Sequence, residues 1–465
     1  MSTVASSRPE QQGVDPAAIR ALVQAWEAAG VRPSGLVIAR HGHVVARAVW
    51  SPYADGDRVQ KYSLSKTFTA CAVGLAVDEG LLRVGDLLVD LFPEVGEVGP
   101  RARTLTVEHL LSMATGHQED TLSRLDDSDV VGSFLHLEPE ADPGTLFTYN
   151  SGATFVLSAV VQQVTGQPLH TYLRPRLLDP LGVGPVEWLT RGGYDQGFSG
   201  LHVDVDAVAA LGLMLLGRGE LAGRRVLPAA WVDAAMSVHV ANATDPATDD
   251  ENDWAQGYGY QMWRSRHGWR GDGAFGQLCL VLPEQDLVLA ATAQTDAMQP
   301  ELDAVWEHLL PGLHDGPLPD GEDLTDFLAA RTLPVIASSA PATPGRHALT
   351  ATGSAASLAP HGTLVVRDGT LVAEQLDGAV LVTLGDGSWV RSSTVLPDGT
   401  TVEIAGTGGW TAPGVLDAAV VLLHSPHTVQ VHADLAARTA ELSWTTVPLW
   451  PLTLRQPNVE TVLTH

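Results

Sequence analysis

Lysine is almost absent from this chain of 465 residues. Only Lys61 and Lys66 occur, and the other 25 of the 27 cationic side chains are arginines. Arginine can replace most surface lysines, but its guanidinium does not lose its proton in proteins, whereas a buried lysine can act as a base. A lysine retained in such a chain therefore indicates a chemical role, such as that of a base. We expect Lys61 to be an ordinary exposed residue and look to Lys66 for the chemistry.

Positive charge is scarce overall. The formal net charge is −27 at pH 7, and no run of basic residues occurs anywhere in the chain. A nucleic acid or an anionic membrane would be repelled over most of such a surface. We therefore expect neither as a partner, and the sequence leaves the oligomeric state open.

Long apolar runs are also lacking. The N-terminus, MSTVASSRPEQQGVDPAAI, has no apolar stretch of signal-peptide length, and no other window approaches the length of a membrane span. These features favour a soluble, cytoplasmic protein.

Cysteine and metal-binding spacings are similarly sparse. The two cysteines, Cys71 and Cys279, lie inside apolar runs, which favours buried structural thiols over a disulfide or a nucleophile. The 17 histidines show no HExxH spacing, and no CxxC pair occurs. We expect no metal site and no cofactor.

The chain is too long for one ordinary domain. Hydrophobic periodicity predicts a helix over about 16–30, a hairpin over 35–50 and a helix over 63–80 that ends at Gly80. Short helical stretches stopped by glycine follow over about 104–230, and after residue 257 the pattern changes to strands.

The last quarter of the chain has a different pattern. A stretch rich in proline, serine and alanine at 333–348 reads as a linker, and Asp-Gly pairs then recur at 368, 377, 386 and 398 between β-rich runs. Hairpin turns at such intervals predict an antiparallel meander or a small barrel. We expect a first domain over 1–332, with a helical subdomain over roughly 84–230, and a C-terminal β domain over 349–465.

The segment KYSLSKTFTA contains the strongest chemical pattern. Ser63 and Lys66 stand at i and i+3 at the start of a predicted helix, so their side chains meet on one face. The helix dipole there favours negative charge that develops at the serine. A hydroxyl beside an amine whose pKa is lowered by burial has the parts of a nucleophile and its base.

Four further segments carry a resemblance. They are LTVEHLLSMATGH, FTYNSGATFVLSAVVQQVTGQPL, LLGRGELAGRRVLPAAWVDAA and GYGYQMWRSRHGWRGDGAFGQLCLVLPEQDLVLAAT. Together with YSLSKTFTACAVGLAVDEGLL, and in this order over roughly residues 10–310, they resemble the serine hydrolases of the penicillin-recognising superfamily. The likeness is to the class C β-lactamase-like branch, which includes DD-peptidases and esterases.

The resemblance implies both a fold and a set of roles. The fold is α/β (α+β), with an antiparallel sheet flanked by helices and a helical subdomain beside it; the helix-then-strand order found above is consistent with that fold. By resemblance, Ser63 is the acylated nucleophile, Lys66 its proton acceptor and Tyr149 a second acid/base. The oxyanion donors are then the backbone amides of Ser63 and Ala274.

Two of the family's three sequence motifs, here called the second and third boxes, differ in this chain. In the second box, Tyr149-Asn150-Ser151, a serine stands at the family's asparagine position and lacks the second donor of an amide. In the third, Gly271-Asp272-Gly273, no cation stands where the family has Lys or His to hold a substrate carboxylate. We expect Asn150, Ser151 and these three residues to contact substrate, with β-lactam turnover disfavoured.

A cluster of cations suggests a partial replacement. Strand alternation would place Arg264, Arg266 and Arg270 on one face if the strand stays regular, although Gly268 can form a bulge. The cluster is either a row of solvated arginines or an anion subsite in which Arg270 holds a substrate carboxylate. His117 and His202 read as loop or capping residues that the mechanism does not need.

Three hypotheses follow. The first is a metal-free serine hydrolase that acts through an acyl-enzyme on small-molecule esters or amides. A β-lactamase or D-amino-acid peptidase is the nearest alternative, which a cytoplasmic location disfavours. The third is a binding or regulatory protein that has kept the fold and lost efficient turnover; the altered third box favours it, and the joint presence of Ser63, Lys66 and Tyr149 opposes it.

Overall fold

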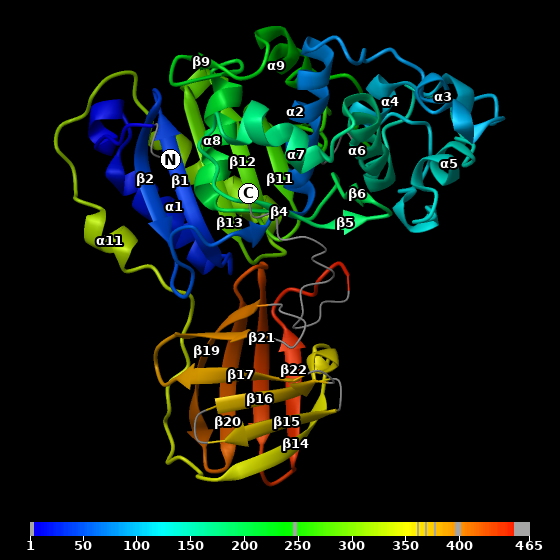
Figure 1. Cartoon of the computed structure of the whole chain (residues 1–465). Coiled ribbons are helices and arrows are strands. Elements are labelled where there is room, and N and C mark those ends of the chain that lie inside the picture. Colours follow the sequence, from blue (N-terminus) through cyan, green and yellow to red (C-terminus); the bar gives the residue numbers. More distant parts are fainter. Residues whose placement is uncertain are drawn as a thin grey trace.

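A six-stranded antiparallel sheet forms the centre of the first domain (Figure 1). The computed structural model describes residues 4–244, 249–359, 362–367, 370–375, 378–395 and 401–450. The strand order is β10-β11-β12-β13-β1-β2. The bounds are β1 Pro33–Arg40, β2 His43–Val49, β10 Trp263–Arg264, β11 Trp269–Gly273, β12 Gln277–Leu282 and β13 Leu287–Ala293.

Helices cover both faces of this sheet, because alternate side chains of its strands are apolar on each side. One face packs against α1 (Pro16–Ala28) and α10 (Met298–Ala304), with Leu36 and Leu280 among its core residues. The other face packs against α2 (Ser65–Asp78) and α8 (Val205–Leu216). The segment that carries Ser63 and Lys66 therefore lies on the second face, next to β11.

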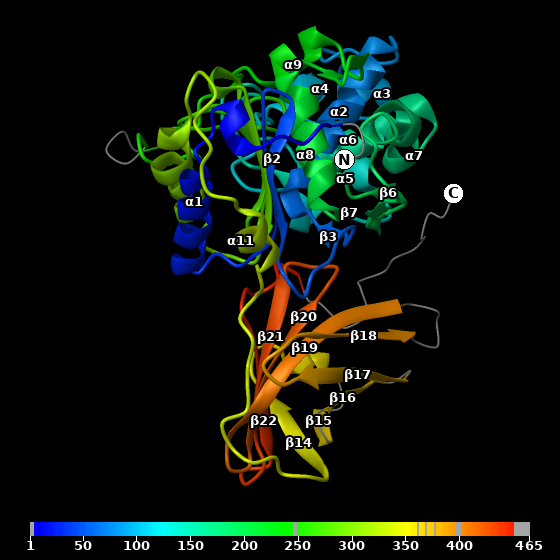
Figure 2. The ribbon, with the colours of Figure 1, turned by 90° about the vertical axis from the view of Figure 1, so that its left-hand side faces the viewer.

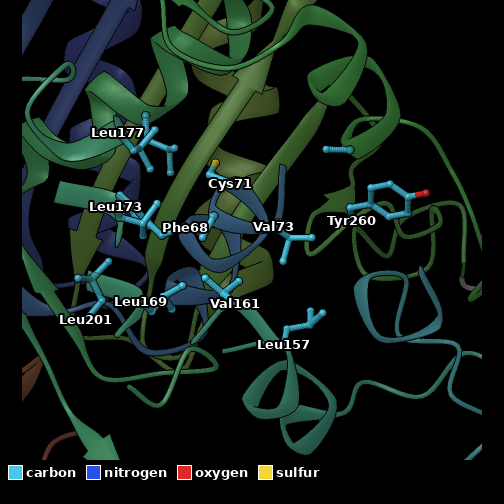
Figure 3. Packing of buried hydrophobic residues seen from close by; sticks show 14 of the residues in the cluster. Phe68, Cys71, Val73, Leu157, Val161, Leu169, Leu173, Leu177, Leu201 and Tyr260 are labelled. Carbon is cyan, nitrogen blue, oxygen red and sulfur yellow. The ribbon is translucent and has the colours of Figure 1, made fainter. Parts of the chain in front are cut away.

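The helical part of the domain stands beside α2 (Figures 1 and 2). Figure 3 shows Phe68 and Cys71 of α2 near Leu169 and Leu173 of α7 in their shared core. The sequence placed the stretch over 205–216 in the helical subdomain, but α8 packs on the central sheet instead. The remaining helices are α3 Leu88–Leu91, α4 Val107–Leu111, α5 Val130–Leu135, α6 Ser151–Thr165, α7 Leu169–Leu173, α9 Ala229–Ala235 and α11 Thr325–Ala329.

Short strands connect these helices. The three-stranded sheet β3-β7-β4 brings β3, which directly precedes the nucleophile segment, beside β7. The bounds are β3 Val59–Gln60, β4 Glu187–Trp188, β5 Thr190–Arg191, β6 Tyr194–Asp195, β7 Leu201–Val203, β8 Glu220–Leu221 and β9 Arg224–Arg225.

The C-terminal domain is a nine-stranded sheet that closes on itself. Its order is β17-β16-β15-β14-β22-β21-β20-β19-β18, and a further parallel pairing of β17 with β19 closes the barrel. All other pairs are antiparallel except β14 with β22. The bounds are β14 Arg346–Thr352, β15 Thr363–Arg367, β16 Thr370–Gln375, β17 Gly378–Gly385, β18 Val390–Val395, β19 Thr401–Ala412, β20 Val415–Leu422, β21 His427–Asp434 and β22 Thr439–Trp444.

The predicted fold class is confirmed: helices flank an antiparallel sheet, and a separate β domain follows. β14 begins at Arg346, three residues before the expected start of that domain. The Asp-Gly pair at 386 lies in the turn between β17 and β18, where Gly387 has a φ of 65°. The pairs predicted as turns at 368, 377 and 398 lie wholly or partly outside the described residues. Among the helices the structure describes, none is both long and apolar enough to cross a membrane.

Candidate active site

Ser63 and Lys66 meet at the start of α2. Ser63 lies in a 3-10 turn, Tyr62–Leu64, that leads into the helix, so the helix proper begins two residues later than predicted. Because the turn continues the helical path, the i, i+3 geometry is kept, and Lys66 Nζ lies 3.0 Å from Ser63 Oγ. The lysine is buried while the serine is half-buried, so Ser63 is the more accessible member of the pair.

The Lys66 amine is held by uncharged oxygens. Nζ donates to the main-chain oxygen of Phe198 at 2.9 Å and lies 3.5 Å from Ser151 Oγ. Burial lowers the pKa of Lys66 to about 7, while the negative charges of Asp120 and Asp272 act in the opposite direction. A large share of the amine is therefore neutral near pH 7 and able to take a proton from Ser63.

Tyr149 completes the group. Its ring stacks on Trp263 with centroids 5.1 Å apart, and Lys66 Nζ lies 4.8 Å from the Tyr149 centroid. A hydrogen bond with the Ser63 side chain lowers the pKa of the phenol, but burial raises it further, so the pKa stays well above its usual range. The phenol beside Ser63 therefore keeps its proton at neutral pH.

The second box supplies one polar group to the site. Ser151 is the first residue of α6, and its hydroxyl faces Lys66. Asn150 is the N-cap of that helix: its side chain accepts from Ala153 N and Thr121 N, and it is fully buried. The expected substrate contact of Asn150 is wrong, because its amide is used to begin the helix.

The glycines of the third box allow a close approach between strand and helix. A Cβ on Gly271 would lie 2.3 Å from Thr67 Oγ1, and one on Gly273 would lie 2.2 Å from the Lys61 carbonyl oxygen. The family's cation has no room at position 271, and neither glycine presents a side chain to substrate. The close approach brings the end of β11, and with it Ala274, beside Ser63.

Asp272 has its own partner. Its carboxylate accepts from Arg270 Nε at 2.9 Å, and both residues are buried. Arg270 Nη1 also donates to the Asp253 carbonyl and to Ser265 Oγ, and its guanidinium lies over the Trp254 ring. Burial raises the pKa of Asp272, while Arg270 and Lys66 act to lower it. Arg270 is therefore held as a buried structural cation, although its Nη2 lacks a hydrogen-bond partner among the described residues, and its contact with a substrate carboxylate stays a prediction.

The predicted row of arginines does not form. Residues 265–268 make the turn between β10 and β11, so Arg264 pairs with Trp269 while Arg270 pairs with Trp263. Arg264 and Arg270 consequently point to opposite faces of the sheet. Arg266, in the turn, forms ion pairs with Asp253 and Asp303. An anion subsite built from all three arginines on one face, which was one of the two alternatives left open by the sequence, therefore does not form.

Lys61 is buried rather than exposed, which corrects the sequence expectation. Its backbone N–H donates to the Leu201 carbonyl, so Lys61 lies at the end of β3 beside β7, and its side chain is buried. Nζ lacks a hydrogen-bond partner among the described residues and faces a cavity of about 20 Å³ that Asp204 and Thr292 help to line. Burial lowers the pKa of Lys61 to about 7. Both lysines are thus buried, but only Lys66 lies beside a nucleophile.

The histidines and cysteines singled out in the sequence are structural. His117 lies between Thr115 Oγ1 and the Leu137 carbonyl, and His202 contacts the Gly200 carbonyl; burial lowers the pKa of both. Cys71 and Cys279 are buried free thiols, as predicted. In the part of the chain that the structure describes, no group of three or more His, Cys, Asp or Glu side chains could hold a metal ion.

Several residues that support the site escaped sequence reasoning. Gln261 is buried, and its amide donates to the carbonyls of Leu110 and Leu111 while accepting from Thr154 on α6. Its main-chain oxygen accepts from Thr67 on α2. Gln261 thereby ties α2, α4 and α6 together, and no local pattern marks it. Trp263, two residues further, stacks on Tyr149, and no local pattern marks it either.

Comparison with known proteins establishes the family. The family model described as Beta-lactamase matches residues 18–311, well over half of the chain. The chain belongs to the beta-lactamase family. The resemblance inferred from the five sequence segments is therefore confirmed. The family comprises hydrolases with the β-lactamase fold, for which a covalent acyl-enzyme is the general mechanism.

Relatives within the beta-lactamase family are distant. The chain is 27% identical over 257 residues to penicillin-binding protein 4 of Amycolatopsis lactamdurans, covering 47% of this chain and 66% of that protein. It is 26% identical over 282 residues to the 6-aminohexanoate-dimer hydrolase of Paenarthrobacter ureafaciens, covering 54% and 70%. The chain thus spans about two thirds of the length of these relatives.

The likeness in fold extends into the C-terminal barrel. The octameric penicillin-binding protein homologue of Pyrococcus abyssi aligns with a TM-score of 0.51 at 16% identity, covering 90% of this chain and 96% of that one. At such low identity the comparison concerns the fold alone.

Proposed function

We propose that this protein is a metal-free serine hydrolase that forms an acyl-enzyme at Ser63 and acts on small-molecule esters or amides. The observation that carries the proposal is the 3.0 Å contact between Ser63 Oγ and the buried amine of Lys66, with Tyr149 bonded to the same serine. A nucleophile, its base and a second proton donor are then within direct reach of one another.

Acylation follows from these positions. Ser63 Oγ attacks the substrate carbonyl while its proton passes to Lys66 Nζ, and the carbonyl π electrons move to oxygen. The backbone amides of Ser63 and Ala274 would hold that oxyanion. When the tetrahedral intermediate collapses, the bond to the leaving group breaks. Tyr149 gives its proton to that group and regains one from Lys66, which restores the neutral amine.

Deacylation uses the same groups in the opposite direction. The Tyr149–Lys66 pair takes a proton from a water molecule as the water oxygen attacks the acyl carbonyl. The second tetrahedral intermediate then expels Ser63 Oγ, which recovers a proton, and releases the acid. Tyr149 acts as a proton relay here rather than as a standing phenolate, because its pKa lies well above neutral.

The polar surroundings favour neutral substrates over carboxylate-bearing β-lactams. Position 271 has no room for a cation, and Arg270 is occupied by Asp272. Asp120 at the exposed rim adds a negative charge that acts on both Lys66 and Tyr149. A substrate carboxylate would meet this charge with no free cation from the third box, so we favour esters and small amides.

The test is the intact mass of the protein within the first turnover after mixing with a p-nitrophenyl ester. An acyl-sized increase is expected in wild type and in Ser128→Ala, which removes an exposed serine hydroxyl, but not in Ser63→Ala. Folded wild type that gives no adduct with this ester, a β-lactam or a fluorophosphonate would reject the hydrolase and support the binding-protein hypothesis.

A further inference from the structure

The barrel contacts the catalytic domain through His427, the first residue of β21. His427 Nε2 lies 2.7 Å from the hydroxyl of Tyr62, the residue immediately before Ser63. The His427 ring also packs edge-on against Phe275, with centroids 4.7 Å apart, and Phe275 packs edge-on against Tyr62 at 5.1 Å. All three rings are buried, so they form one cluster between the domains.

The direction of each hydrogen bond in this cluster is fixed by its partners. His427 Nδ1 lies 3.0 Å from the carbonyl oxygen of Thr446, which only accepts, so Nδ1 carries the proton. The Thr446 hydroxyl donates to the Pro426 carbonyl. Nε2 is then an acceptor, and Tyr62 donates its hydroxyl proton to it. Burial lowers the pKa of His427 to about 4, which keeps the ring neutral in this arrangement.

The two rings that His427 touches flank the two oxyanion donors. Tyr62 directly precedes Ser63, and Phe275 directly follows Ala274. Both Tyr62 and Phe275 have left-handed backbones, with φ of 45° and 68°. Residues other than glycine rarely adopt this backbone conformation, which persists where the surrounding structure holds it in place.

The catalytic domain holds the backbones of these two residues only in part. The Phe275 carbonyl accepts from Gln277 Nε2 at 3.1 Å, and the Ser65 N–H bonds to the Tyr62 carbonyl. The phenol hydroxyl finds its acceptor on the barrel. Further contacts between the domains lie close by: Gln60 N donates to the His424 carbonyl, and Tyr53 donates its hydroxyl proton to the Ser425 carbonyl.

We propose that the C-terminal barrel positions the oxyanion hole of Ser63 and Ala274 through His427, which clamps Tyr62 by a hydrogen bond and Phe275 by ring contact. This inference rests on the proposed acyl-enzyme function. His427 is a positioning residue, because it touches neither Ser63 nor the expected position of the oxyanion. The barrel is thereby part of the catalytic apparatus rather than an appended module.

The test is acylation of the full-length protein by p-nitrophenyl acetate, followed as the p-nitrophenolate burst and as the infrared carbonyl stretch of the acyl-enzyme. Tyr62→Phe removes only the hydroxyl, and His427→Leu removes the acceptor. We expect both substitutions to slow acylation by about tenfold, which is a smaller effect than the slowing caused by removal of an oxyanion donor. KM should change by less than about twofold. The acyl carbonyl band should move to higher wavenumber, because its hydrogen bonds are longer.

Two further variants sharpen the test. His427→Gln keeps an oxygen acceptor for Tyr62 and should give a rate and a carbonyl band between those of wild type and His427→Leu. His432→Gln changes an exposed histidine of the same strand, whose ring lies 2.6 Å from the Asp417 carboxylate and away from Tyr62, and should behave as wild type. Circular dichroism melts establish folding, and if His427→Leu does not fold, Tyr62→Phe decides the matter.

The outcomes separate the two proposals. Wild type that acylates at Ser63 alongside folded Tyr62→Phe with the same rate and the same carbonyl band would overturn the positioning role and leave the hydrolase intact. Absence of any Ser63-dependent adduct in wild type would overturn both. A slower rate in Tyr62→Phe with a shifted carbonyl band supports the role, because a merely stabilising contact would not move that band.

Discussion

Lys66 Nζ lies 2.9 Å from the main-chain oxygen of Phe198, so the buried amine is held by a neutral acceptor and not by a carboxylate. An ion pair would keep the lysine protonated. A carbonyl orients the amine without opposing loss of the proton, which suits a group that must accept one from Ser63.

Replacing Lys66 by arginine keeps a positive charge and a similar length but removes the ability to lose a proton. We expect Lys66→Arg to slow acylation by at least about a thousandfold, toward the upper end of what general-base catalysis contributes. Burst kinetics with p-nitrophenyl acetate measure the rate, and a melting curve shows whether the variant folds. Acylation at the wild-type rate would exclude Lys66 as the base.

The pH profile should report the same amine. Because the free base is the active form and burial lowers the pKa of Lys66 to about 7, acylation should rise with pH through about 7 and then level off. Asp120 raises this pKa, so Asp120→Asn should move the rise to lower pH. Asparagine can still accept from the backbone amides of Leu122 and Gly152. A profile unchanged by this substitution would contradict the electrostatic coupling.

Lys61 should lower the free energy of unfolding near pH 7. Its pKa is lowered to about 7 on folding, so near and below pH 7 the folded state carries the cost of a buried charge. That cost falls as pH rises from about 7 toward the unfolded value of 10.5, because the unfolded state then binds more protons. We expect Lys61→Met to raise the free energy of unfolding at pH 7 by a few kcal/mol, on the order expected from such a shift.

Urea unfolding at several pH values checks this expectation. The difference between wild type and Lys61→Met should shrink between pH 7 and 10, and acylation by the p-nitrophenyl ester should be retained. A variant less stable than wild type at pH 7 would show that Lys61 makes a favourable interaction through the small cavity beside it.

The Arg270–Asp272 pair should behave as one buried unit. Removal of one partner leaves the other charge buried, which typically costs about 3–5 kcal/mol. We expect Arg270→Met to be destabilised by about that amount, and Arg270→Met combined with Asp272→Leu to recover part of it. The measurement is urea unfolding of both variants. Purely additive losses would contradict the coupling, and a KM change confined to carboxylate-bearing esters would support the substrate role predicted for Arg270.

The structural features that the sequence predicted correctly are those that depend on local patterns. The i, i+3 spacing of Ser63 and Lys66, the apolar strands of the central sheet and the Asp-Gly turn at 386 each depend on neighbours in the chain. The position of Tyr149 followed from the order of the family boxes. Contacts between distant segments do not alter these elements, because helices and hairpins are formed from local hydrogen bonds.

Some of the errors came from contacts between distant segments. Lys61 is buried because its backbone pairs with Leu201, and the arginines separate because a turn at 265–268 reverses the strand. Asn150 is taken up as a helix cap although the family box marks its neighbourhood as functional. Asn150 and Gly268 carry local signals for a helix cap and a turn, which the resemblance and the assumed strand alternation outweighed, whereas no pattern near Lys61 or Tyr62 marks their contacts with Leu201 and His427.

The contact between Tyr62 and His427 joins two segments that the ribosome makes far apart in time. Tyr62 and His427 are separated by 365 positions, so the phenol that precedes the nucleophile is made long before its hydrogen-bond acceptor. A growing chain that has completed the helices and the six-stranded sheet still lacks the acceptor for this hydroxyl. The positioning role proposed for His427 therefore implies that full acylation requires a translated and folded barrel, and that a chain cut within the linker acylates more slowly.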